Sequence, residues 1–173
     1  VIEKYPANYS VLENALGTVV HSQSARELAN EYYGADVANS LYVVPLAQDR
    51  ERMPDREEAR AALGVRPDEL LLCSFGIVHD RKRAKELVLA WRQLLRLLRG
   101  ARSPRRRLFF VGFAEEQYER MLRDLGGAEI TITGWVSESD YRAYLAAADV
   151  AIQLRGENRG ESSRSVLECM IAG

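Results

Sequence analysis

Two polar loops carry residue types that could bind an anion. One loop begins at Gly76 and places Lys82 and Arg83 immediately before a helical pattern. The other runs from Arg155 through two glycines into a second helical pattern. Glycine lets a ligand approach the backbone closely, and the amides at a helix N-terminus point at an anion. Guanidinium groups bind phosphate through two parallel hydrogen bonds. The two loops therefore predict a phosphate-binding site.

The second loop leads into a helix that could also contact a sugar. The serines at its start are Ser162, Ser163 and Ser165. Glu168 lies about one turn into this helix, where its carboxylate could accept hydrogen bonds from sugar hydroxyls. Each loop alone also fits a simpler structure, a solvated basic loop for the first and a capped helix with surface charges for the second. No GxGxxG or GxxxxGK[ST] pattern is present, which argues against an ordinary dinucleotide site and against a P-loop NTPase.

Composition narrows the class of protein. The 173 residues carry a formal net charge of -1, and 47% of them are hydrophobic. Balanced charge argues against a dedicated nucleic-acid binder, and no apolar run approaches the roughly 18 residues of a membrane span. The two cysteines, Cys73 and Cys169, lie in apolar stretches and exclude a disulfide scaffold. With two histidines and no clustered carboxylates, we expect no metal site, and a reducing cytoplasm fits best.

Strands alternate with helices through the part of the chain that holds both loops. The expected strands are 70–76, 107–111, 129–133 and 149–154, and the expected helices begin near residues 84, 118, 137 and 163. The first strand is a continuous apolar run, as in parallel strands that are buried on both faces. The fold class is therefore α/β, a doubly wound parallel sheet. In such a sheet the first and fourth strands lie side by side where the winding reverses, so the two loops should meet there.

The preceding part of the chain also alternates. Its expected elements are strands over 18–20 and 41–44, helices over 24–33 and 55–63, and a polar linker over 48–54. Ser24 with Glu27 three residues later reads as a capping box for the first helix, which should stop at Gly34. Asp55 is the expected N-cap of the second helix.

In order and spacing, these pieces resemble the donor-binding half of retaining GT-B glycosyltransferases of family four, the glycosyl transferases group 1. The matching stretches are 20–22, 43–46, 74–76 with Lys82, Arg83 and Ala90, 111–112, 133–136, 148–150 and 160–173. The resemblance covers nearly the whole chain. It implies a Rossmann-like half of a GT-B fold that is truncated at both ends. Residues 1–45 would be the remnant of an N-terminal acceptor domain, and 46–173 an incomplete donor-binding domain.

The resemblance also assigns roles. Lys82 would contact the donor diphosphate, Glu168 would hold the nucleotide ribose as the second glutamate of an E-x7-E motif, and the backbone of Val136 would contact the base. Residues 162–165 would meet the phosphate and the donor sugar. The full expected nucleotide-sugar site is Gly76, Lys82, Arg83, Val136, Arg155, Glu161, Ser162, Ser163, Ser165 and Glu168. The catalytic residues stay unassigned, because the family's catalytic histidine belongs to the absent domain.

Two positions depart from the family pattern. Ile77 stands where the family usually has an arginine after the first-strand glycine, and Gly160 stands where E-x7-E has its first glutamate. Glu161 comes one place later and could replace that glutamate through a change in the loop. The contact with the donor sugar, and the identity of that sugar, stay open.

The resemblance implies a donor that is a nucleotide diphosphate sugar, with no further cofactor and no metal. A hexose-type sugar would pass to a glycan or lipid-linked acceptor in polysaccharide biosynthesis, and the fragment alone would bind donor without transferring it. Arginines between Arg92 and Arg107 read as a solvated basic face, or as a peripheral contact with anionic lipid at the inner face of the membrane. The alternatives are a GT-B-like sugar-nucleotide epimerase and a degenerate, non-catalytic domain used for assembly.

Overall fold

The computed structural model describes residues 6–47, 53–98, 104–156 and 160–173. The chain divides into two compact units. The smaller unit comprises Val1–Asp49 with Glu157–Arg164, and the larger comprises Arg50–Gly156 with Ser165–Gly173. Each unit is described by itself below.

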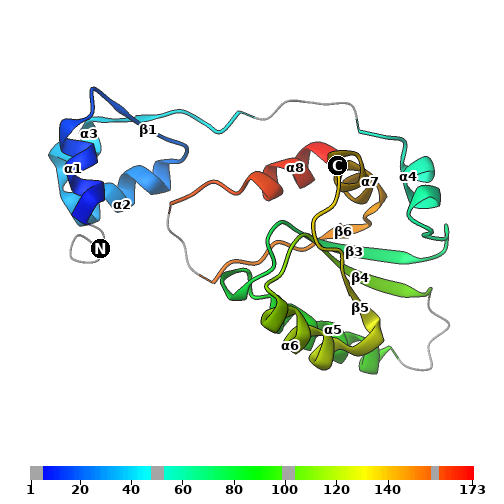
Figure 1. Cartoon of the computed structure of the whole chain (residues 1–173). Coiled ribbons are helices and arrows are strands. Elements are labelled where there is room, and N and C mark those ends of the chain that lie inside the picture. Colours follow the sequence, from blue (N-terminus) through cyan, green and yellow to red (C-terminus); the bar gives the residue numbers. More distant parts are fainter. Residues whose placement is uncertain (1–5, 48–52, 99–103, 157–159) are drawn as a thin grey trace. The chain divides into compact units, whose positions relative to one another are not determined.

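A parallel sheet forms the centre of the larger unit (Figure 1). Its described strands are β3 (Leu70–Phe75), β4 (Arg106–Val111), β5 (Ile130–Ile132) and β6 (Val150–Ala151). They lie in the order β5-β4-β3-β6, and all neighbours are parallel. Leu72 pairs with Val150, so the first and fourth expected strands are neighbours. The prediction of a doubly wound sheet whose winding reverses between these two strands is therefore confirmed.

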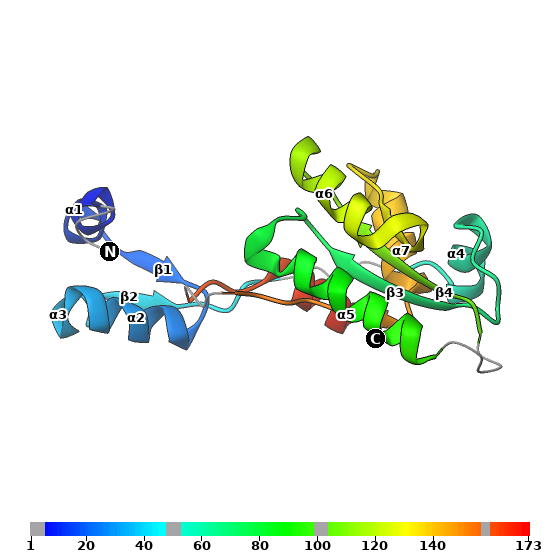
Figure 2. The ribbon, with the colours of Figure 1, turned by 90° about the horizontal axis from the view of Figure 1, so that it is seen from below.

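The helices of the larger unit cover both faces of this sheet. They are α4 (Arg56–Ala62), α5 (Ala84–Leu97), α6 (Glu116–Gly126), α7 (Glu138–Ala147) and α8 (Arg164–Ala172). Side chains alternate along a strand, so Leu72 faces α5 and α6 while Leu71 and Cys73 face α4, α7 and α8. Figure 1 shows these two groups of helices on opposite sides of the sheet, and Figure 2 shows α5 running along the length of β3.

The last strand is shorter than expected. The pattern predicts a strand over 149–154, but regular strand covers only Val150–Ala151. The amides of Asp149 and Ile152 still donate to carbonyls of β3, at 2.9 and 2.8 Å. The paired register with β3 covers Leu72 with Val150 and Cys73 with Ala151.

Asp149 joins α4 to the entrances of two strands. Its carboxylate accepts a hydrogen bond from the Leu71 amide at 2.7 Å and pairs with Arg60 at 3.1 Å and with Arg56. The Arg60 guanidinium is buried and also donates to the Ala147 carbonyl at 2.9 Å. Asp149 therefore orders the entrances of β3 and β6.

The smaller unit holds two parallel strands, β1 (Thr18–Val20) and β2 (Leu41–Val43), and three described helices. The helices are α1 (Pro6–Asn14), α2 (Gln23–Tyr33) and α3 (Ala35–Asn39). The expected N-cap Ser24 is wrong. Ser22 has extended backbone and its Oγ accepts the Ala25 amide at 3.0 Å, so α2 begins earlier than the pattern indicates. The sequence pattern did not predict α1 or α3.

Among the described residues, no helix combines the length and the apolar character that crossing a membrane requires. The predicted linker falls largely on residues 48–52, which lie outside the described residues.

Candidate anion-binding site

The loop after β3 places Lys82 over the carboxyl end of that strand. The chain turns at Gly76, passes through a 3-10 turn over Asp80–Lys82, and enters α5 after Arg83, which has φ 52°. His79 caps the turn, because its Nδ1 accepts the Arg81 amide at 3.1 Å. Lys82 folds back, and its Nζ donates to the Phe75 carbonyl at 2.7 Å. The ammonium group is therefore held at the end of a central strand, where ligands of doubly wound sheets bind.

Two glycines make this close approach feasible. A Cβ on Gly76 would lie 2.6 Å from the Lys82 Nζ, and a Cβ on Gly112 would lie 2.2 Å from the Gly76 carbonyl oxygen. Both glycines also have positive φ, at 91° and 155°. The turn after β3 therefore fits beneath Lys82 and beside the turn after β4 only because neither position carries a side chain.

The loop after β6 meets the loop after β3, as the fold predicts. The Gly156 amide donates to the Arg81 carbonyl at 2.8 Å. A Cβ on Gly156 would lie 2.7 Å from Nε of Arg83, so the guanidinium passes directly over this glycine. The same guanidinium pairs with Glu86 at 2.9 Å.

Positive charge is concentrated where these loops meet. Burial lowers the pKa of Lys82, and the positive charge of Arg155 lowers it further. The pKa of His79 is lowered by burial first, and then by Lys82, Arg81 and Arg155. These side chains repel one another, so a bound anion would relieve the repulsion and favour the charged form of Lys82.

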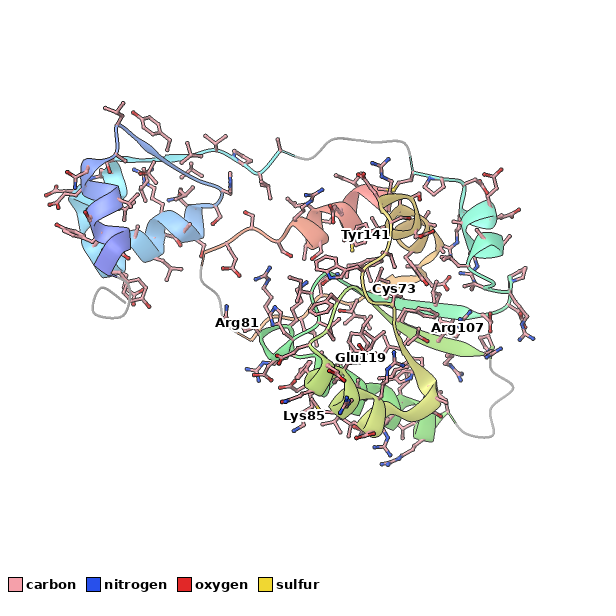
Figure 3. All side chains as sticks on the ribbon, viewed as in Figure 1. Cys73, Arg81, Lys85, Arg107, Glu119 and Tyr141 are labelled. Atoms are coloured by element: carbon pink, nitrogen blue, oxygen red, sulfur yellow. The ribbon has the colours of Figure 1, made fainter. Side chains whose placement is uncertain are left out.

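Glu168 is the half-buried acidic residue that α8 adds to the larger unit. The Tyr141 hydroxyl, on α7, donates to Glu168 Oε2 at 2.7 Å. The Tyr141 ring packs edge-on against Phe75, with centroids 5.5 Å apart and planes at 73°. Figure 3 shows Tyr141 beside α8. Phe75, the last residue of β3, therefore supports Tyr141, the hydrogen-bond partner of Glu168.

The remaining predicted residues divide between the two units. Val136 is half-buried against the α7 side of the core, and Ser165 is buried. Ser162, with its neighbours Glu161 and Ser163, belongs to the smaller unit, where the Ser162 hydroxyl donates to the His21 carbonyl at 3.2 Å. Within the larger unit, the loop contacts join the segments that carry Gly76, Lys82, Arg83 and Arg155.

Gly160 has a structural reason to lack a side chain. Its φ is 75°, and a Cβ there would lie 2.5 Å from the Ala25 Cα within the smaller unit. The Ser22 hydroxyl also donates to its carbonyl. A glutamate could not adopt this backbone arrangement, so the departure from the E-x7-E pattern is built into the local packing.

Sequence reasoning missed two features. The helical spacing of Tyr141 and Tyr144 predicts that both rings lie in the core, and nothing local indicates that the Tyr141 hydroxyl reaches Glu168. Phe113 and Trp135 stack at 5.7 Å between centroids and are 41% and 75% exposed. Each follows the end of a strand, which is the signal that could have placed them at the same edge of the sheet.

Two arginines of the predicted basic cluster between Arg92 and Arg107 contact other residues of the chain. Arg105 pairs with the buried Glu69 at 3.2 Å, and the Arg107 guanidinium lies 4.6 Å from the centroid of the Phe109 ring. Arg99 and Arg102 lie outside the described residues. In the part of the chain that the structure describes, no group of three or more His, Cys, Asp or Glu residues could hold a metal ion.

Comparison with solved structures finds the same fold. HepE of Anabaena, solved in complex with UDP and glucose, matches 99% of this chain with a TM-score of 0.78 and 18% identity. Sucrose-phosphate synthase from Thermosynechococcus elongatus matches 98% with a TM-score of 0.76 and 21% identity. The C-terminal domain of LpcC, a glycosyl transferase group 1 family protein from Francisella tularensis, matches 72% of this chain and 66% of its own, with a TM-score of 0.54 and 15% identity.

The chain covers 47% of HepE and 42% of the sucrose-phosphate synthase, so it spans less than half the length of these relatives. No curated protein sequence matches it. The structural matches establish a Rossmann-like domain of the GT-B fold. The family described as glycosyl transferases group 1 matches residues 55–173, which is most of the chain. The chain belongs to the glycosyl transferases group 1 family.

Proposed function

We propose that the larger unit binds the nucleoside diphosphate part of a sugar donor for a retaining glycosyltransferase. The observation that carries the proposal is the position of Lys82, whose ammonium group is held at the carboxyl end of β3 beside the loop of Arg155. Family membership supports the reaction class and favours it over an epimerase. HepE, which has the same fold, was solved with UDP and glucose.

The chemistry follows from the charges. During transfer, the bond between the anomeric carbon and the diphosphate oxygen breaks, and its electron pair leaves with the diphosphate. The acceptor oxygen forms the new bond to that carbon, and its proton passes to an oxygen of the departing diphosphate. Lys82, Arg155 and the amides of the two loops would stabilise the charge that grows on the leaving group, without a metal or other cofactor. Arg83 contributes less directly, because Glu86 already pairs with it.

The remainder of the donor would extend from this site. Glu168 would accept hydrogen bonds from the ribose, and the backbone at Val136 would contact the base. Glu161, Ser162, Ser163 and Ser165 would contact phosphate and sugar. We propose a hexose-type sugar and a glycan or lipid-linked acceptor, in polysaccharide biosynthesis in the cytoplasm. Contact of the Arg92–Arg107 cluster with the inner membrane face belongs to the same proposal.

A comparison of two lysines tests the proposal. Calorimetric titration of the chain with UDP, GDP, dTDP and ADP should show binding of at least one nucleotide. Lys82→Ala should weaken that binding about tenfold or more, because it removes a charge-assisted contact. Lys85→Ala is the matched control, since Lys85 is an exposed residue of α5 (Figure 3) and should leave the affinity unchanged. Equal affinities in the wild type and Lys82→Ala would overturn the role of Lys82.

A further inference from the structure

Glu168 is tied to a second helix through one of its two carboxylate oxygens. The Tyr141 hydroxyl donates to Oε2 at 2.7 Å, across a separation of 27 residues in sequence. A glutamate side chain loses considerable rotamer freedom when it is ordered. A carboxylate that is already oriented by a fixed donor avoids that loss when a ligand binds.

Tyr141 is itself held in place. Its ring packs edge-on against Phe75, and it lies against the buried cluster that α7 and the sheet share. The start of α7 is fixed by Ser137, whose side chain accepts the Asp140 amide at 3.1 Å. The Tyr141 hydroxyl is therefore a donor at a defined point rather than a mobile group at the surface.

Phe75 connects this tyrosine to the anion-binding loop. Its ring packs against Tyr141, while its carbonyl accepts a hydrogen bond from the ammonium group of Lys82 at 2.7 Å. The last residue of β3 thus supports both the cation proposed for the diphosphate and the donor that orients Glu168. The packing around Phe75 therefore positions both Lys82 and Tyr141.

We propose that Tyr141 is a positioning residue, which orients the Glu168 carboxylate to accept hydrogen bonds from the nucleotide ribose. It thereby sets the preference for ribonucleotides over nucleotides that lack the ribose hydroxyls. This inference rests on the proposed function, because it requires Glu168 to contact the ribose.

The test compares two tyrosines of α7. Tyr141→Phe removes the hydroxyl and retains the ring, and Tyr144→Phe makes the same chemical change in a residue that packs against Phe109 instead. The probes are the ribonucleotides UDP, GDP and ADP, with the 2′,3′-dideoxy form of whichever of them binds most tightly. Calorimetry gives both dissociation constants for each variant, and the melting temperature of each variant reports its folding.

The expected result is a selective loss. Tyr141→Phe should weaken binding of the nucleotide with ribose hydroxyls by roughly threefold to tenfold, the effect of one hydrogen bond, and should leave the dideoxy form unaffected. Tyr144→Phe should change neither affinity. Glu168→Ala should bring both forms to the same affinity, and Tyr141→Phe in that background should add nothing further.

Each other outcome rejects a particular statement. If Glu168→Ala lowers the preference for ribose hydroxyls but Tyr141→Phe does not, the positioning role is wrong and the proposed function stands. An equal loss of both ligands in Tyr141→Phe would show that the tyrosine acts through packing alone. If Glu168→Ala leaves the preference unchanged, the ribose contact itself is wrong. The ratio of the two affinities is independent of the folded fraction, so partial unfolding cannot imitate the expected result.

Discussion

The ammonium group of Lys82 lies against Phe75 and Gly76. Burial and the charge of Arg155 lower its pKa, while the Phe75 carbonyl accepts its ammonium group at 2.7 Å. Because Gly76 has no side chain, the ammonium group can lie directly over the turn. A half-buried cation held this way is costly without an anion and well placed for one.

Gly76→Ala tests this dependence. The substitution should destabilise the fold by about 1–2 kcal/mol, because φ is positive, and should also displace Lys82 and weaken nucleotide binding about tenfold. Gly64→Ala is the control, since Gly64 has φ 62° but open space around its Cβ position. It should lose similar stability and keep its affinity, as measured by urea denaturation and calorimetry. Loss of affinity in both variants would contradict the specific role of Gly76.

At the scale of elements, the Asp149 carboxylate joins α4 to β3 and β6. Burial raises its pKa, but the Leu71 amide, the Arg60 hydrogen bond and the charges of Arg60 and Arg56 outweigh burial, and the net pKa is lowered. A carboxyl group whose pKa is lowered in the folded state stabilises that state above its unfolded pKa. Its contribution is lost as the pH falls through the folded value.

Asp149→Asn should therefore cost about 1–3 kcal/mol at pH 7, because Arg60 would stay buried beside a neutral amide. The difference in the free energy of unfolding between the variant and the wild type should shrink as the pH falls below 3.8, the ordinary pKa of an aspartate. Asp68→Asn is the control, since its pair with Arg66 at 3.2 Å is exposed and should contribute about 0–1 kcal/mol. Denaturation curves at pH 7 and pH 3 measure both differences. A constant difference at the two pH values would contradict the linkage.

For the whole molecule, ligand binding should appear as added stability. A nucleoside diphosphate at about 100 times its dissociation constant should add about 2.7 kcal/mol. For a chain of this size, that corresponds to roughly 5–10 °C in the melting temperature. Inorganic phosphate at the same concentration serves as the control and should shift the melting temperature much less. Equal shifts would show that the chain responds to phosphate rather than to a nucleotide.

The parts of the fold that were predictable depend on local pattern. Leu70 to Phe75 is apolar at every position except Ser74, and Ser137 precedes a helical repeat, so these residues indicate a buried strand and a helix start without knowledge of their neighbours. The prediction that Ser24 caps α2 was wrong because Ser22, two residues earlier, also carries a hydroxyl that can cap a helix. Only its extended backbone identifies Ser22 as the cap.

The sequence by itself determined the alternating elements, the doubly wound sheet and the two loops that meet at its reversal, because hydrophobic periodicity and glycine placement are local properties. Only the tertiary structure decided that Tyr141 reaches Glu168, that Gly112 lies against Gly76, and that Gly160 packs on Ala25. Each of these contacts joins segments far apart in the chain. Its existence depends on the distance between backbones, which no local pattern contains.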